Sequence, residues 1–326
     1  MMLLRSSIDR GRFLTTGAAA AVALAPRRSF AQALTTLRVT AVPNDDTTPL
    51  LYAQQSGLFR RAGLDVTITP STSGAAIAAA VVSGSYDIGL ISMMASIAGH
   101  VHGLPFVMIA PSLLYLASNP TQELLVLKDS PIRSVSDLAG KVVACSSIRD
   151  VGWVSVRALA DQRGIDSSTI KFVELPMVTV AAALEAHRID AGSILNPTLE
   201  EAMATGHFRT VGAPFDGIAK RWLVAAWCTT TDFVAKNRDV VDRFASVMRA
   251  ATAYSNSHHT ETAPLIATFT GIDLAHAVTM QRVDLAEYLD PRDVQPAIDA
   301  AAKYGVIDKG FPAQELISPY AIKPPR

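Results

Sequence analysis

Residues 37–69 constrain the fold more than any other part of the chain. Apolar and polar residues alternate at both ends of this stretch, as in strands that bury one face. Between these strands, Thr48 is suited to cap a short helix, Pro49 to occupy its first turn, and Gly57 to end it. The polar loop at 43–47 therefore follows a strand and precedes a helix. Open α/β sheets bind small ligands at such loops.

The same rhythm continues along the chain. Further strands are predicted at 86–90, 106–110, 141–145, 170–175, 191–195 and 223–230. Helices are predicted at 75–82, 151–163, 178–187 and 197–205, and again over much of 240–305, including Leu274 to Val283. Strands that alternate with helices at these intervals predict an α/β fold with largely parallel sheets.

Several motifs resemble those of one protein family. Residues 51–66 contain the pattern A-x-x-x-G-L-F-x-x-x-G-L-x-V, residues 84–89 contain G-x-x-D-I-G, and residues 134–141 end in D-L-A-G-K. These motifs resemble the NMT1/THI5-like (SsuA-like) solute-binding proteins. That family supplies the binding components of ABC importers for nitrate, sulfonates, taurine and thiamine precursors. The resemblance extends over nearly the whole chain after residue 33.

The resemblance implies a periplasmic-binding-protein-like type II fold, with two doubly wound α/β lobes joined by a two-stranded hinge. Lobe 1 would comprise 34–127 plus 224–326, and lobe 2 would comprise 128–223. It also implies a monomer that captures a small organic molecule between the lobes and delivers it to an ABC permease in the membrane. The ATPase would be a separate chain, since no Walker A loop is present.

Residues 1–33 are predicted to be an export signal. A basic start is followed by an alanine-rich apolar stretch and an A-x-A cleavage site that ends at Ala33. Gly11 separates Arg10 from Arg12 where a twin-arginine signal has two adjacent arginines, so both the Sec and the twin-arginine routes stay open. We therefore expect a periplasmic protein whose signal is cleaved after Ala33.

Charge and motifs exclude several classes of function. The full chain has 29 basic and 29 acidic residues, and the predicted signal removes more arginines than acids, which leaves a mildly acidic protein. The absence of a basic run argues against nucleic acid as a partner. No histidine or cysteine spacing suggests a metal site, and no G-x-S-x-G elbow or dinucleotide fingerprint occurs. We predict no cofactor, no catalytic residues and no enzymatic activity.

Cys145 and Cys228 are the only cysteines of the chain. An exported protein could pair them in a disulfide. Each lies in an apolar, strand-like run, which favours two buried free thiols.

Candidate ligand-binding residues follow strands and precede helices, where backbone N–H groups are free to donate. Those of the first lobe are Asn44, Asp45, Asp46, Thr47, Ser73, Gly74, Ala75, Ser92 and Met93. Those of the second lobe are Ser147, Arg149, Trp153, Met177 and Asn196.

Each prominent candidate also has a structural interpretation. Arg149 could hold an anion in bidentate fashion or lie on the surface. Asp45 and Asp46 could bind an N–H group of the ligand, although we expect one of them to cap the helix. Trp153 and Met93 could form an apolar wall, but core packing is the commoner role of such residues.

The expected ligand is a small organic molecule, and an organic acid, a sulfonate or a heterocycle is favoured. Two other functions remain as alternatives: an enzyme of the same fold, such as a pyrimidine-precursor synthase, and a sensory binding protein that presents its ligand to a membrane receptor.

Overall fold

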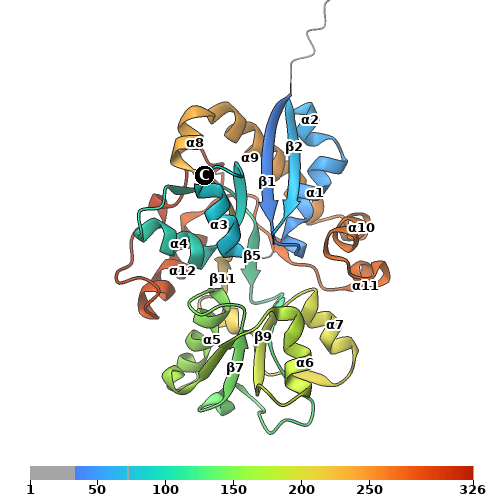
Figure 1. The fold of residues 1–326 in the computed structure, drawn as a ribbon, viewed down its shortest axis with the longest axis vertical. Helices are drawn as coiled ribbons and strands as arrows, with labels where there is room; N and C mark the ends of the chain where they lie inside the picture. Colours follow the sequence, from blue (N-terminus) through green and yellow to red (C-terminus); the bar gives the residue numbers. More distant parts are fainter. Residues whose placement is uncertain (1–33, 72, 326) are drawn as a thin grey trace, which may run out of the picture. The chain divides into compact units, whose positions relative to one another are not determined.

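Strand β1 (Thr35–Ala41) lies inside the first sheet. The computed structural model describes residues 34–71 and 73–325, so the predicted export signal lies outside the described residues. Among these residues the sheet order is β2-β1-β3-β12-β4. The other strands are β2 (Leu64–Pro70), β3 (Ile88–Ser92), β12 (Ala225–Thr230) and β4 (Phe106–Pro111). β1 is parallel to β2, which lies beside it in Figure 1, and to β3. β12 is antiparallel to β3 and β4, so it returns the chain to the first sheet as predicted.

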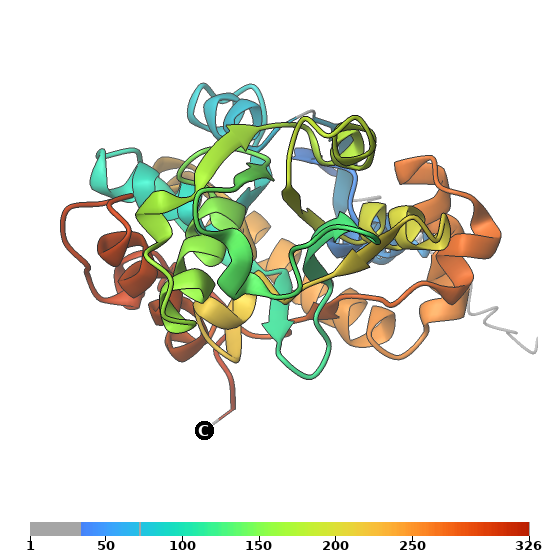
Figure 2. The same cartoon turned by 90° about the horizontal axis from the view of Figure 1, so that it is seen from below.

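The second sheet has the order β10-β6-β9-β7-β8, with helices around it (Figure 2). Its strands are β10 (Phe208–Thr210), β6 (Gln122–Leu127), β9 (Ala191–Leu195), β7 (Val142–Cys145) and β8 (Lys171–Glu174). We expected β6 in the first lobe, but it pairs with β9 and β10. A short apolar run is compatible with either sheet, and only the strand it pairs with determines which sheet it joins. The residues at which the chain crosses between the lobes stay a prediction.

Three short strands form a third sheet, in the order β11-β5-β13. They are β11 (Arg221–Leu223), β5 (Leu113–Leu116) and β13 (Asp284–Leu285). In sequence, β5 lies between β4 of the first sheet and β6 of the second, and β11 lies between β10 and β12. β5 and β11 pair antiparallel, and each lies in sequence between a strand of the first sheet and a strand of the second. Their role as the hinge stays a prediction. β13 adds a third strand that the sequence analysis did not predict.

Helices pack around both main sheets (Figures 1 and 2). The first six along the chain are α1 (Thr48–Gln55), α2 (Leu58–Arg61), α3 (Gly74–Val82), α4 (Met93–Val101), α5 (Val151–Gln162) and α6 (Val180–Glu185). The later ones are α7 (Thr198–Ala204), α8 (Thr231–Lys236), α9 (Arg238–Ser255), α10 (His259–Thr270), α11 (Leu274–Thr279) and α12 (Pro291–Lys303). The helix predicted up to Val283 ends at Thr279, and an extended segment follows it.

The helix after the polar loop starts one residue earlier than predicted. α1 includes Thr48, whose hydroxyl donates to the Asp45 carbonyl at 2.6 Å instead of capping a helix N–H group. Gly57 has φ 75°, the left-handed conformation predicted at the helix end.

The core follows from the period-two pattern of the strands. In the second sheet, Leu124 and Val143 face one buried cluster, while their neighbours Leu125 and Ala144 face another on the opposite side. The first sheet has a larger core that includes the fully buried Trp227. Residues 34–326 form one compact unit, and none of its described helices is both long and apolar enough to cross a membrane.

Candidate functional site

The loop between β1 and α1 is held by hydroxyl groups, one from the loop itself and one from the residue after β4. Thr47 donates its hydroxyl to the Asn44 carbonyl at 2.5 Å, and Ser112, which follows β4, donates to the Asp46 carbonyl at 3.1 Å. Asp45, Asp46 and Thr47 are all buried. The loop is therefore a fixed structure at the carboxyl end of β1 rather than a mobile connection.

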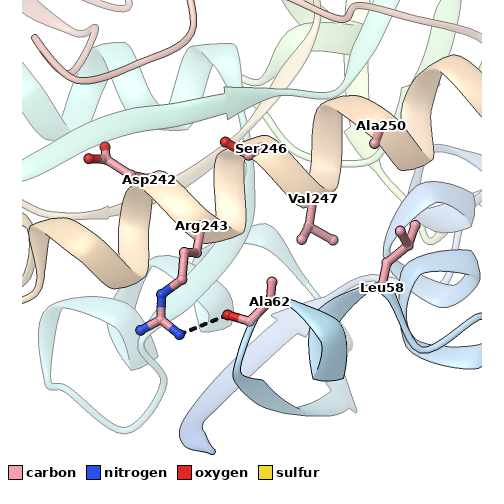
Figure 3. A pocket seen from close by; sticks show the side chains of 7 residues that line it. All are labelled: Leu58, Ala62, Asp242, Arg243, Ser246, Val247 and Ala250. Atoms are coloured by element: carbon pink, nitrogen blue, oxygen red, sulfur yellow. Dashed lines mark hydrogen bonds between the residues drawn. The ribbon is translucent and has the colours of Figure 1, made fainter. Parts of the chain in front are cut away.

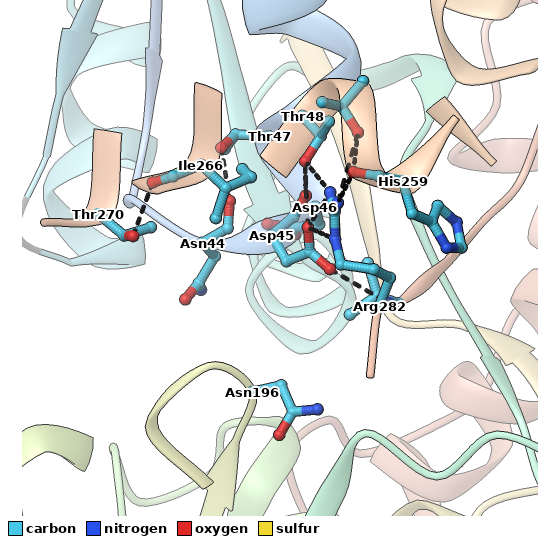
Figure 4. A network of polar contacts seen from close by, with 12 residues as sticks. Asn44, Asp45, Asp46, Thr47, Thr48, Asn196, His259, Ile266, Thr270 and Arg282 are labelled. Carbon is cyan, nitrogen blue, oxygen red and sulfur yellow. Dashed lines mark hydrogen bonds and ion pairs between the residues drawn. The ribbon is translucent and has the colours of Figure 1, made fainter. Parts of the chain in front are cut away.

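Asp45 forms a buried ion pair with Arg282, from the extended segment after α11 (Figure 4). The closest nitrogen–oxygen distance is 2.6 Å, and the exposed fractions of the Arg282 and Asp45 side chains are 5% and 1%. The second carboxylate oxygen of Asp45 accepts the Val283 N–H at 2.9 Å. Thr48 donates its hydroxyl to the first oxygen at 3.1 Å. All of these partners belong to the protein, so Asp45 anchors the loop.

Asp46 differs sharply from its neighbour. Its side-chain oxygen Oδ1 is buried and has no hydrogen-bond partner among the described residues. Burial, followed by the nearby negative charge of Asp45, raises the pKa of Asp46 to about 7. A buried carboxyl oxygen without a hydrogen-bond partner is costly in a folded protein.

Asn196 follows β9 of the second sheet and lies apart from the Asp45–Arg282 network, with its side-chain oxygen turned away from the β1–α1 loop (Figure 4). Its side-chain Nδ2 donates to the Gln281 carbonyl at 3.0 Å, whereas its Oδ1 is buried without a partner among the described residues. Gln281 precedes Arg282, so Asn196 and Asp45 bind adjacent residues of one segment.

A second contact joins loops of the two sheets. Ser92, at the end of β3, donates its hydroxyl to Asp150 Oδ1 at 2.9 Å. Asp150 directly precedes α5, in the loop that follows β7. Side-chain contacts thus link the end of β3 to the loop after β7, and the loops after β1 and β9 through residues 281–282. That these loops form a ligand site stays a prediction.

The other predicted residues of the first lobe have different surroundings. Ser73 caps α3 by accepting the Ala76 N–H at 3.2 Å, and both Ser73 and Ala75 are exposed. Gly74 begins α3 and is half-buried. Met93 is fully buried in the core. Their role at a ligand site stays a prediction.

The second-lobe candidates are similarly divided. Arg149 is exposed, with φ 66°, and has no ion pair within the described part of the chain. Ser147 donates to Glu174 at 3.3 Å, and Met177 packs against two hydrophobic clusters. Trp153 is half-buried, with its ring 4.6 Å from the Arg157 guanidinium carbon and 5.8 Å from the ring of Phe172. Their contact with a ligand also stays untested.

The sequence analysis missed Arg282, Gln281, Asn119 and Ser112. Asn119 lies on the β5–β6 crossing and donates to the Arg282 carbonyl at 3.0 Å and to Asp284 at 2.8 Å. Gln281 donates its side-chain amide to Asn119. None of these residues lies in a recognisable motif, and Arg282 is 237 positions away from Asp45.

A separate depression of about 340 Å³ lies between α2 and α9 (Figure 3). Leu58 and Val247 contribute apolar surface, and Arg243 donates to the Ala62 carbonyl at 2.8 Å. The guanidinium is thus already occupied, and the depression lies apart from the strand-end loops. We do not assign a ligand to it.

Cys145 and Cys228 are both free and buried, as favoured from the sequence. Burial raises the pKa of each thiol to about 12. The described residues contain no group of three or more His, Cys, Asp or Glu side chains placed to hold a metal ion.

Comparison with known proteins gives sequence relatives of two kinds, synthases and putative binding proteins. The putative binding protein BAB2_1146 of Brucella abortus is 21% identical over 240 residues, which are 70% of this chain and 69% of that protein. A family described as NMT1/THI5 like matches residues 44–262. The chain is 27% identical over 218 residues to the 4-amino-5-hydroxymethyl-2-methylpyrimidine phosphate synthase THI11 of Saccharomyces cerevisiae. The match covers 63% of this chain and 62% of that protein. The chain is also 30% identical over 157 residues to the synthase of the same name from Legionella pneumophila, 48% of each chain. The chain thus spans less than two thirds of the length of these synthases.

Solved structures with a similar fold include proteins named as periplasmic binding proteins. The periplasmic aliphatic sulphonate binding protein SsuA from Escherichia coli superposes with a TM-score of 0.74 and 17% identity, over 89% of this chain and 94% of that one. The periplasmic nitrate-binding protein NrtA from Synechocystis gives 0.72 and 13%, over 86% and 84%. These likenesses confirm the predicted two-lobe, periplasmic-binding-protein fold.

One prediction from the sequence is wrong. We expected no enzymatic activity, but the relatives at 27–30% identity are named as synthases. The absence of a catalytic-triad, metal-binding or dinucleotide-binding motif does not exclude catalysis in a fold whose ligand-binding residues come from separate loops.

Proposed function

The chain belongs to the NMT1/THI5-like family, and from that premise we propose that it captures a small organic molecule between its two lobes. The captured ligand would contact the loops after β1 and β3 on one side and those after β7 and β9 on the other. Lobe closure would be stabilised by contacts that the ligand makes with both sides at once.

One observation carries this proposal. Asp46 Oδ1 and Asn196 Oδ1 come from the two different sheets, are buried, and have no partner among the described residues. An unsatisfied buried polar atom costs about 1–3 kcal/mol, so two of them near one segment need an explanation. A ligand that donates a hydrogen bond to either oxygen would remove the cost at that atom.

We further propose that the protein is exported and passes its ligand to a membrane permease that works with a separate ATPase chain. The leader-like sequence of residues 1–33 supports export. A further structural neighbour is named as the ligand binding component of an ABC-type import system from Staphylococcus aureus, which supports delivery to a transporter.

A thermal-shift screen of the purified chain tests ligand capture. The compounds would be small carboxylates, sulfonates, nitrate, amines and pyrimidines. A compound at 100 times its dissociation constant should stabilise the fold by about 2.7 kcal/mol. Asn196→Ala should abolish the shift. Asn256→Ala is the matched control, because Asn256 also donates its amide to a carbonyl, that of Leu285 at 2.9 Å. Equal loss in both variants, or no shift with any compound, would contradict the proposal.

A second candidate is the synthesis of a phosphorylated aminopyrimidine, because the sequence relatives carry that name. Mass spectrometry of the protein incubated with candidate precursors tests it. Release of a phosphorylated aminopyrimidine would establish catalysis, whereas unchanged recovery of a bound compound would leave capture as the function.

A further inference from the structure

Asp150 is placed to cap helix α5, but its side chain bonds to the other lobe instead. It is the N-cap residue of α5, with extended backbone angles (φ −91°, ψ 179°), and its side chain accepts no N–H group of that helix. Its Oδ1 accepts the hydroxyl of Ser92, at the end of β3, at 2.9 Å. We propose that Asp150 is a two-position switch, which bonds Ser92 when the lobes are together and caps α5 when they part. This inference rests on the proposed lobe closure and concerns the chain without a ligand.

Other aspartates at the same position do cap their helices. Asp273 accepts an N–H group of α11 at 2.8 Å, and Asp290 accepts one of α12 at 2.9 Å. The backbone of Asp150 lies in the same extended region as theirs. Capping is therefore open to Asp150, because a turn of its side chain would exchange the Ser92 hydroxyl for N–H groups of the first helical turn.

The loop that carries Asp150 is fixed to its own lobe. The Ile148 N–H donates to Glu174 Oε1 of β8 at 2.7 Å, and the Ser147 hydroxyl donates to the same oxygen at 3.3 Å. Ser92 belongs to the first sheet, as the last residue of β3 and the N-cap residue of α4. The Ser92–Asp150 bond therefore joins two fixed frameworks, and it breaks when these two loops separate.

The opposite end of α5 is attached to the first lobe in a different way. Tyr304, at the end of α12, donates its hydroxyl to Asp161 Oδ2 at 2.9 Å, and the other oxygen of Asp161 accepts the Ser167 N–H at 2.9 Å. Tyr304 is buried, so breaking this bond would leave its hydroxyl without a partner. Asp150 avoids that cost, because helix N–H groups take the place of Ser92. Lobe opening would thus pivot near Asp161 and release at Asp150, about 16 Å away along the helix.

The two positions of Asp150 exchange one kind of bond for another. In each, the carboxylate accepts hydrogen bonds from neutral donors, which are the Ser92 hydroxyl or the backbone N–H groups at the positive end of the helix dipole. The switch therefore lowers the free-energy cost of opening, compared with a latch whose carboxylate has no second partner in the chain.

Spin labels on the two lobes test the switch in the full chain without added ligand. Thr260→Cys in α10 and Glu201→Cys in α7 provide exposed label sites, and the two native cysteines are buried. Ser92→Ala should raise the ratio of open to closed molecules about tenfold, as expected for the loss of a hydrogen bond to a charged acceptor. Asp273→Ala, which removes the cap of α11, should leave the label distance unchanged.

Hydrogen–deuterium exchange distinguishes a switch from a simple latch. In Ser92→Ala, Asp150 is free to cap α5, so N–H exchange over residues 151–154 should slow severalfold although the lobes are further apart. Asp150→Ser should open the lobes to the same extent, because serine caps a helix but lacks the carboxylate. Asp150→Ala should open them and also speed the exchange, since alanine neither bonds Ser92 nor caps.

The outcomes separate this inference from the proposed function. An unchanged label distance in Ser92→Ala, or exchange over 151–154 that is unchanged or faster in that variant, would overturn the switch. Both measurements are made without ligand, so a failed ligand screen beside the expected distances and exchange would overturn capture alone. If Ser92→Ala fails to fold, the two Asp150 variants decide: slower exchange with serine than with alanine supports the switch, and equal exchange overturns it.

Discussion

Replacing Arg282 by methionine leaves Asp45 buried without its counterion. Removing one partner of a buried pair costs about 3–5 kcal/mol. Asp45 would keep the Val283 N–H and the Thr48 hydroxyl, so we expect a loss near the lower end, about 3 kcal/mol. The β1–α1 loop should also lose its attachment, and ligand affinity should fall together with stability.

Urea unfolding followed by circular dichroism measures the loss. Arg292→Met is the matched control, because Arg292 pairs with Asp290 at the same 2.6 Å distance but has an 85% exposed side chain. Exposed pairs contribute about 0–1 kcal/mol, so the control should stay within that range. The double variant of Arg282→Met with Asp45→Asn should lose less than the sum of the two single variants, because the uncompensated charge is gone.

A loss below about 1 kcal/mol for Arg282→Met, similar to that of the exposed control, would refute the reasoning. It would mean that solvent reaches Asp45 and that the segment after α11 does not hold the loop. Strong weakening of the Arg282–Asp45 effect in 1 M salt would indicate the same, since buried pairs are little screened.

Three further predictions follow from burial and close packing. Because the buried Asp46 keeps its proton up to a pKa of about 7 while the unfolded chain loses it near 3.8, the unfolding free energy should fall as pH rises between these values, by about 4 kcal/mol at most. Asp46→Asn should remove this fall in pH-dependent urea unfolding, and an identical profile in the variant would contradict the assignment. Gly217→Ala should lower the melting temperature and cost about 3 kcal/mol, because a Cβ there would lie 2.3 Å from the Leu159 backbone nitrogen; an unchanged melting temperature would show that α5 can shift. Cys145 and Cys228 should react with Ellman's reagent only after denaturation, and rapid reaction of the native protein would show that the thiols are accessible.

Local pattern was sufficient to predict much of the fold. The alternation at 37–41 and 64–69 corresponds to β1 and β2, and Gly57 has the left-handed conformation that its place after a helix requires. These features depend on residues close in sequence. The sheet that β6 joins does not depend on nearby residues, because β6 pairs with β9, which lies far from it in sequence.

The candidate site was predicted only in outline. The loop containing Asp45 and Asp46 could be located, because it joins a strand to a helix. The sequence gives no sign that one carboxylate binds Arg282 while the other stays unpaired. That difference arises from a segment 237 positions away, which a pattern read along the chain does not connect to the loop.

Capture and catalysis place different demands on the same few side chains. Cys145 and Cys228 are poor nucleophiles at neutral pH, since burial raises each thiol pKa to about 12. Asp46, with a pKa of about 7, has the acidity that a general acid or base needs. A binding protein would use this carboxyl only to pair with its ligand, so Asp46→Asn would weaken affinity. A synthase would also use it to move a proton, so the same substitution would lower kcat even where substrate still binds.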